Sequence, residues 1–226
     1  MIIVSYTSSE YYLNMEDMLH ECCEKFGIKH VRYNREWFIT TDFCKEHMDI
    51  ANQKRGAGFW SWKPSVILDA FQYDDTVVYL DASVVFDEDP YNFVDENQYM
   101  TVGHHGKNFM NREWIKRDAF VLMNCDKPEY WNDYQVWAGQ VVVGKYAIHL
   151  VEEWKFWCGD RRIITDLPNM QGSPNFPEFV DHRHDQAILS ILSTKYPDSI
   201  HRANSVFHDY GGNYTEWVSW KAKGRR

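Results

Sequence analysis

Residues 76–86 read TVVYLDASVVF, a dense run of β-type residues interrupted by Asp81, Ala82 and Ser83. We expect residues 76–80 to form a buried strand that ends at Asp81. Such a strand delivers a carboxylate to its carboxyl end, with a small hydroxyl side chain two residues later. A divalent cation that prefers oxygen ligands and bridges phosphates could use part of this set. An Asp that only caps the following turn explains the pattern equally well.

Strands and helices alternate on both sides of this run. Further strands are predicted at residues 2–6, 28–33, 99–102 and 140–143. Helices are predicted at residues 12–26, 41–53, 64–71, 128–136, 147–157 and 185–196. This order indicates an α/β fold, with a mostly parallel central sheet flanked by helices in a single domain. We expect the domain to span residues 1–210, with residues 211–226 as a C-terminal tail or linker.

Ligands of such sheets bind beyond the carboxyl ends of the strands, so the residues after each strand are candidates for the site. They are Thr7-Ser8-Ser9, Asp81-Ala82-Ser83, Gly103-His104-His105 and Gly144-Lys145.

Composition excludes several classes of protein. The net charge of −9 argues against a general binder of nucleic acid or anionic membranes. The 10 Trp, 14 Tyr and 13 Phe residues suit a cleft for ring-shaped ligands as well as a core. Five cysteines without CxxC spacing indicate reduced thiols. With no basic leader and no apolar run of about 18 residues, we expect a soluble, cytoplasmic monomer.

Residues 54–64 read KRGAGFWSWKP. Two glycines permit a close bend of the backbone, Arg55 and Lys63 flank them, and Pro64 suits the first turn of a helix. A helix N-terminus attracts anions, so a diphosphate would fit here. A tight turn with a Trp-rich core plug is the alternative.

Residues 181–189 read DHRHDQAIL, a polar cluster that opens an amphipathic helix. Capping of that helix explains an acidic side chain here. The spacing of His182 and His184 also suits zinc, although no convincing third ligand follows closely.

Two further motifs have simpler explanations. Arg117 and Asp118 stand in another charged run, which is typical of a solvated helix face. The small residues Ala138 and Gly139 precede a predicted strand, where core packing is the simpler reason for them.

Taken together, these motifs resemble nucleotide-sugar-dependent glycosyltransferases of the GT-A fold, which is Rossmann-like. They also resemble the amino-terminal transferase domains encoded by large algal viruses (chloroviruses). The motifs are the short first strand with Ser and Thr, Gly-x-Gly-x-Trp-x-Trp-Lys-Pro, Tyr-Leu-Asp-Ala-Ser, Trp-Ala-Gly and His-Asp-Gln. They span residues 2–208, nearly the whole chain.

The resemblance implies a role for each motif. Tyr6, Thr7 and Ser8 would contact a uridine nucleotide, Arg55 and Lys63 the phosphates, and Asp81, Ala82 and Ser83 the nucleotide sugar. Mn²⁺ or Mg²⁺ would be held by Asp81, Ser83 and His208, and Asp185 and Gln186 would be catalytic. One departure is Ser83, where the family motif usually has a second Asp. Asp87, Asp209 or additional water would then complete the shell, or the site has weakened.

The implied activity is transfer of a sugar from a UDP-sugar to a hydroxyl of a glycan or glycoprotein. Inversion would use Asp185 as general base, whereas retention, which the resemblance favours, would use Asp185 or Gln186 to stabilise the sugar cation. If virus-encoded, the enzyme would work in the host cytoplasm. One alternative is a non-catalytic carbohydrate-binding protein, motivated by the aromatic rings and Ser83. Another is a metal-dependent hydrolase built on His182, His184 and Asp185.

Overall fold

The computed structural model describes residues 1–92, 99–104, 108–203 and 207–209. Its centre is a six-stranded sheet in the order β2-β1-β3-β6-β5-β7. The strands are β1 (Ile2–Thr7), β2 (Lys29–Asn34), β3 (Thr76–Leu80), β5 (Met100–His104), β6 (Val136–Gly144) and β7 (Ile200–Ala203). A separate pair is formed by β4 (Val84–Val85) and β8 (His208–Asp209).

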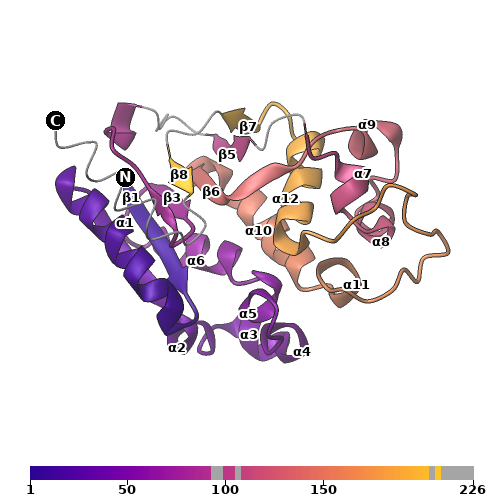
Figure 1. Cartoon of the computed structure of the whole chain (residues 1–226), viewed down its shortest axis with the longest axis horizontal. Coiled ribbons are helices and arrows are strands. Elements are labelled where there is room, and N and C mark those ends of the chain that lie inside the picture. Colours follow the sequence, from indigo (N-terminus) through magenta and orange to yellow (C-terminus); the bar gives the residue numbers. More distant parts are fainter. Residues whose placement is uncertain (93–98, 105–107, 204–206, 210–226) are drawn as a thin grey trace.

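Helices cover both faces of the sheet (Figure 1). The longer ones are α1 (Leu13–Lys25), α6 (Lys63–Ala70), α10 (Ile148–Cys158) and α12 (His184–Lys195). The shorter ones are α2 (Arg35–Phe38), α3 (Asp42–Glu46), α4 (Met48–Ala51), α5 (Gly56–Phe59), α7 (Asn111–Trp114), α8 (Arg117–Leu122), α9 (Pro128–Trp131) and α11 (Arg161–Ile164). Short 3₁₀ turns are η1 (Glu10–Tyr12), η2 (Pro90–Asn92) and η3 (Lys145–Ala147).

Successive side chains of the buried strands point to opposite faces of the sheet, so the hydrophobic core has two parts, one on each face. In β1, Ile3 faces α1 together with Val78 of β3, whereas Val4 faces the larger core with Val77. That larger core is covered by α6, α10 and α12. Because both faces are buried, β1 and β3 are apolar almost throughout.

Strand β6 runs opposite to its neighbours, and the remaining pairings of the six-stranded sheet are parallel. The predicted α/β class with a mostly parallel sheet is therefore confirmed. The expectation that Gly144-Lys145 lies at the ligand-binding edge is wrong. Gly144 pairs with Thr76, the first residue of β3, so it lies at the opposite edge. The reversal instead brings the start of β6 to the edge where Asp81 lies.

Two predicted helices have different extents. The expected helix over residues 41–53 breaks at His47 into α3 and α4, although Thr41 does cap α3 by accepting a hydrogen bond from the Cys44 amide. The expected helix over residues 128–136 ends at Trp131, and β6 begins at Val136. Val136, the one β-branched residue of this segment, already belongs to the sheet.

Among the described residues, no helix combines the length and the apolar character needed to cross a membrane. The predicted tail, residues 211–226, lies outside the described residues, as does His105.

Candidate active site

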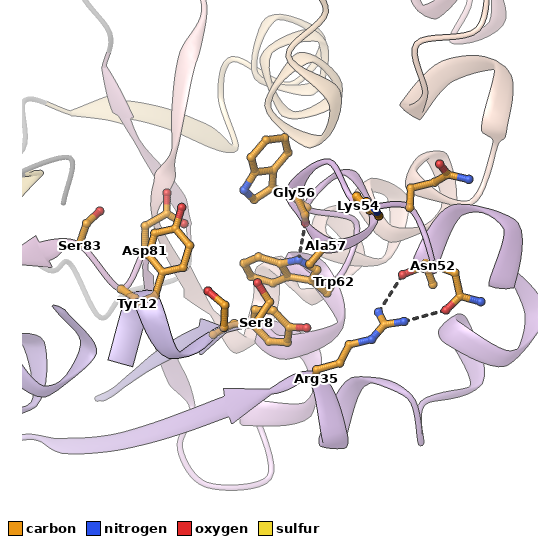
Figure 2. Close-up of a pocket in the computed structure, with 16 residues that line it drawn as sticks. Ser8, Tyr12, Arg35, Asn52, Lys54, Gly56, Ala57, Trp62, Asp81 and Ser83 are labelled. Carbon is orange, nitrogen blue, oxygen red and sulfur yellow. Dashed lines mark hydrogen bonds between the residues drawn. The ribbon is translucent and has the colours of Figure 1, made fainter. Parts of the chain in front are cut away.

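Two adjoining pockets open beyond the ends of β1 and β3. The large pocket, about 720 Å³, is lined from β1 and the turn after it, from residues 51–62, and from Asp81, Ala82 and Ser83 (Figure 2). The small pocket, about 190 Å³, is lined by Arg55, Trp60, Lys63, Asp81 and residues 182–186. The two pockets share Trp60 and Asp81, so they form one cleft with two compartments.

The cleft brings together most of the residues that the sequence nominated. Tyr6, Ser8, Asp81, Ala82 and Ser83 line the large pocket. Arg55, Lys63, Asp81, Asp185 and Gln186 line the small one. Thr7 is buried at the end of β1 and lines neither pocket. His208 belongs to β8, but its side chain lies outside the described part of the chain.

Lys63 lies in the wall of the small pocket, next to Asp81, which both pockets share. It lies in the first turn of α6, is only 4% exposed, and donates a hydrogen bond to the carbonyl oxygen of Ala138 at 3.1 Å. Its Nζ lies 3.1 Å from Oδ1 of Asp81 and 3.5 Å from Oδ2 of Asp185. Burial disfavours the ammonium charge, but Asp185 and Asp81 outweigh it and raise the pKa of Lys63. Lys63 is therefore a fixed cation between two carboxylates.

Asp185 is nearly inaccessible to water, with 3% of the residue exposed. Burial raises its pKa to about 7, Lys63 opposes this rise, and the negative charge of Asp81 adds to it. Its Oδ2 accepts no hydrogen bond from the described residues, although the Lys63 ammonium lies 3.5 Å away. A buried carboxylate oxygen in a pocket wall is available to a ligand hydroxyl, and this carboxyl can exchange a proton near neutral pH.

Gln186 follows Asp185 on α12 and is held against the start of β6. Its Oε1 accepts from the amide of Ala138 at 3.4 Å, and its Nε2 donates to Oε1 of Gln135 at 3.3 Å. The amide orientation is thereby set by the backbone of the sheet.

Oxygen donors gather at the end of β3. Oδ1 of Asp81 accepts a hydrogen bond from the Tyr79 hydroxyl at 2.6 Å. The Ser83 hydroxyl donates to Oδ1 of Asp209 at 2.7 Å, which brings a second carboxylate close to the position where the family motif has one. Among the described residues, no group of three or more His, Cys, Asp or Glu side chains is placed to hold a metal. Oxygen donors of this kind fit Mg²⁺ or Mn²⁺, which commonly bind one or two carboxylates and take further ligands from substrate phosphates and water.

The contacts of Gly139 explain the small residues Ala138 and Gly139, which lie within β6. A Cβ on Gly139 would lie 2.3 Å from Nε1 of Trp137 and 2.7 Å from Oδ2 of Asp81. The missing side chain therefore leaves room for the Trp137 ring beside the Asp81 carboxylate, so packing at the edge of the cleft accounts for this glycine.

Arg55 is engaged in ion pairs with the chain itself. Its guanidinium lies 2.5 Å from Oδ2 of Asp181 and 3.1 Å from Oδ2 of Asp166. These contacts join the residue 54–60 turn to the segment before α12. Arg55 thus has a positioning role in the structure, in addition to its place in the pocket wall.

His182 and His184 do not form a zinc site. Nε2 of His182 hydrogen-bonds the carbonyl oxygen of Ile163 at 2.7 Å, and its Nδ1 accepts from the Lys116 amide at 3.3 Å. Both ring nitrogens of His182 are thus occupied. Nδ1 of His184 hydrogen-bonds the carbonyl oxygen of Ile164 at 2.7 Å. Burial lowers the pKa of both rings, so they are neutral structural groups.

Sequence reasoning gave no role to several residues of the large pocket. Arg35, which follows β2, donates to the carbonyl oxygen of Ala51 at 2.7 Å and to Oδ1 of Asn52 at 2.8 Å, which orients that wall (Figure 2). Tyr12 fits the apolar spacing of the predicted helix, but it lies in η1, 43% exposed, at the pocket. Periodicity cannot distinguish an aromatic residue of a core from one at a cleft.

No family model matches the sequence, and no curated protein matches it. Solved structures do match. Mouse xyloside xylosyltransferase 1 has a TM-score of 0.51 at 6% identity, over 89% of this chain and 84% of that chain. A glycosyltransferase involved in glycosylation of the major capsid of PBCV-1 has a TM-score of 0.48 at 12% identity, over 90% and 82%. The galactosyltransferase LgtC has 0.46 at 14%, over 91% and 74%.

The last two TM-scores fall below 0.5, so neither establishes the fold of this chain. Xyloside xylosyltransferase 1 shares the fold over most of both chains. The chain therefore shares the fold of this xylosyltransferase, in agreement with the GT-A fold that the sequence motifs predicted.

Proposed function

We propose that the protein is a glycosyltransferase that moves a sugar from a UDP-sugar to a hydroxyl of a glycan or glycoprotein acceptor. The observation that carries this proposal is the buried Lys63, held between Asp185 of the small pocket and Asp81, which lines both pockets. Burying a cation and two carboxylates carries a desolvation cost, which their mutual attraction offsets only when the geometry is good. In a two-compartment cleft, this cation lies at the junction between a leaving diphosphate and a reacting sugar.

The large pocket is assigned to the nucleotide. Its volume of about 720 Å³ lies within the usual range for ligand pockets. Tyr6 and Ser8 line it from the end of β1, and Thr7 lies between them in the chain. The choice of uridine comes from the family resemblance. The small pocket, which contains Asp185 and Gln186, is assigned to the sugar.

Mn²⁺ or Mg²⁺ is assigned to the end of β3, where Asp81, Ser83 and His208 would hold it. Asp209, through its hydrogen bond with Ser83, is assigned as the source of the missing second carboxylate. When bound, the ion would offset negative charge on the leaving diphosphate.

The chain's own residues account for the rest of the reaction. The bond between the anomeric carbon and the diphosphate oxygen breaks, and a bond to the acceptor oxygen forms. Lys63 orients Asp81 and Asp185 from its buried position. For retention, which the resemblance favours, Asp185 or Gln186 stabilises the positively charged sugar, and the acceptor proton leaves with the diphosphate. For inversion, Asp185 would instead take that proton as general base, for which a pKa of about 7 is suitable.

Calorimetric titration of UDP tests the proposal. We expect binding in the presence of Mn²⁺ and at least tenfold weaker binding in EDTA. Asp81→Asn should abolish the metal dependence. Asp75→Asn is the matched control, because Asp75 pairs with Lys145 at the opposite edge of the sheet. Wild-type protein that binds UDP in neither condition would contradict the proposal, as would an Asp81→Asn variant with unchanged metal dependence.

Ser83 stands where the family motif usually has a second Asp, and this difference supports one alternative function. The alternative is a non-catalytic carbohydrate-binding protein with the same fold. That protein would bind glycans without nucleotide. Hydrolysis of UDP-glucose, UDP-galactose or UDP-N-acetylglucosamine by wild-type protein, lost in Asp185→Asn, would exclude it.

A further inference from the structure

Residues 56–60 form a left-handed turn. The φ angles of Gly56, Ala57, Gly58, Phe59 and Trp60 are 56°, 51°, 106°, 56° and 57°. Glycine tolerates this region, but Ala57, Phe59 and Trp60 have a Cβ that disfavours it. Consecutive residues in this conformation persist only where the surrounding structure imposes it, and such strain is concentrated at functional sites.

Several contacts impose the turn. The indole of Trp62 donates to the carbonyl oxygen of Gly56 at 3.1 Å. Arg55, directly before the turn, is anchored by Asp166 and Asp181. Phe59 is buried, with its ring centroid 4.7 Å from that of His184. The turn is therefore held by Trp62 from its own segment and by Asp166, Asp181 and His184 from the segment around the start of α12.

The consequence of the turn is the position of Trp60. A Cβ on Gly56 would lie 2.3 Å from Cε3 of Trp60, so the indole is folded directly onto the glycine. On the other side, Trp60 stacks with His184 at a centroid distance of 5.7 Å and an interplanar angle of 28°. The partly buried indole lines both the large and the small pocket. It is thus a wall between the two compartments.

Three buried residues in the wall of the small pocket have little freedom to move, whereas Arg55 and Arg183 in the same wall are exposed. Lys63, His184 and Asp185 are buried, and each is held by contacts with the chain. The small pocket is about 190 Å³, against about 720 Å³ for the large one. On the side that faces the large pocket, the space for a substituent on the sugar therefore depends on the wall that Trp60 forms.

We propose that Trp60 is a specificity-determining residue that excludes donor sugars with bulky substituents and admits unsubstituted ones. This inference rests on the proposed function, since it assigns the small pocket to the donor sugar. Selectivity of this kind comes from a clash with the wrong ligand rather than from added contacts with the right one.

The experiment compares UDP-glucose with UDP-N-acetylglucosamine, which differ in the substituent at C2. Donor hydrolysis gives kcat/KM for each, and the ratio cancels effects that are common to both donors. We expect wild-type protein to prefer UDP-glucose by at least tenfold. Trp60→Ala should reduce this ratio at least tenfold, and Trp60→Phe should lie between them.

Gly56→Ala provides an independent variant that leaves the indole in the sequence. Its methyl group would displace the ring, so it should reduce the ratio in the same direction. Gly27→Ala is the matched control, because Gly27 also has a positive φ, 68°, but has open space where the Cβ would lie. It carries the same type of backbone strain and should leave the ratio unchanged.

Thermal melting of each variant separates a change of the pocket from loss of folding. A ratio unchanged in folded Trp60→Phe and Gly56→Ala would overturn the inference, as would a wild-type preference for UDP-N-acetylglucosamine. Wild-type protein that binds no UDP and turns over no UDP-sugar would instead overturn the proposed function, and this inference with it.

Discussion

Lys63 has the most demanding environment of the residues in the cleft, because a buried ammonium is stable only with its partners. Lys63→Met would leave Asp81 and Asp185 facing each other without a cation. We expect a loss of about 3 kcal/mol in the free energy of unfolding, measured by urea denaturation, together with loss of donor turnover. The physical reason is the uncompensated buried charge.

Two variants control this prediction. Lys63→Arg keeps the charge and should restore part of the stability. Lys145→Met removes an exposed lysine that pairs with Asp75, and it should have little effect. A Lys63→Met protein with the same urea midpoint as wild type would show that the two ion pairs contribute nothing.

At the scale of elements, α1, β1 and β2 are joined by one polar chain. The Ser5 hydroxyl of β1 donates to Oε1 of the buried Glu16 at 2.5 Å. It therefore accepts from Nε2 of His30 in β2, 2.9 Å away. Burial lowers the pKa of His30 to about 3, and the positive charges of Arg32 and His20 add to this effect.

This depressed pKa predicts a pH dependence of stability. Below its ordinary pKa of about 6.5, His30 binds a proton in the unfolded chain but not in the folded one. The free energy of unfolding therefore falls as pH decreases from about 6.5 toward 3. Between pH 7.5 and 5.5, we expect wild type to lose about 1 kcal/mol more than His30→Gln.

Urea denaturation at the two pH values measures the difference. His149→Gln, which removes an exposed histidine of α10 that hydrogen-bonds the carbonyl oxygen of Tyr146, is the matched control and should behave as wild type. Equal pH dependence in wild type and His30→Gln would contradict the assignment.

At the scale of the whole molecule, residues 165–183 connect α11 to α12 without a helix or strand (Figure 1). Both oxygens of the buried Asp118 hold this segment, accepting from the amides of Met170 at 2.6 Å and Gln171 at 3.1 Å. Asp166 and Asp181 then link it to Arg55 across the cleft. The segment thus couples the region around α8 to the left-handed turn.

Asp118→Asn should therefore loosen the connection. Asparagine keeps one acceptor oxygen and replaces the other with a donor, so one part-buried amide loses its partner. We expect a loss of about 2 kcal/mol in the free energy of unfolding. Hydrogen exchange measured by mass spectrometry should accelerate in residues 166–181 and stay unchanged in β1 and β3. Asp198→Asn, at an exposed position before β7, is the control. Unchanged exchange in residues 166–181 would contradict this role.

Local pattern was sufficient for most elements of the fold. Apolar runs and helical spacing predicted β1, β3, α1, α10 and α12 near their observed positions, because residue type and period act within a few neighbouring residues. The motif at the end of β3 also indicated the correct edge of the sheet. The fold class follows from the alternation of these elements.

The arrangement of the site depended on contacts between distant residues. Nothing near Val136 in the chain indicates that β6 runs antiparallel, and that direction decides which end reaches the cleft. Lys63 and Asp185 are 122 positions apart, so only the packing of α6 against β1 and β3, and of α12 against β6, brings them to 3.5 Å. Burial in the folded chain raises the pKa of Asp185, and hydrogen bonds with Lys116 and Ile163 occupy both ring nitrogens of His182. Local sequence sets which residues form each strand and helix, whereas burial and the distances between charges exist only once the chain has folded, because both depend on what surrounds each group in space.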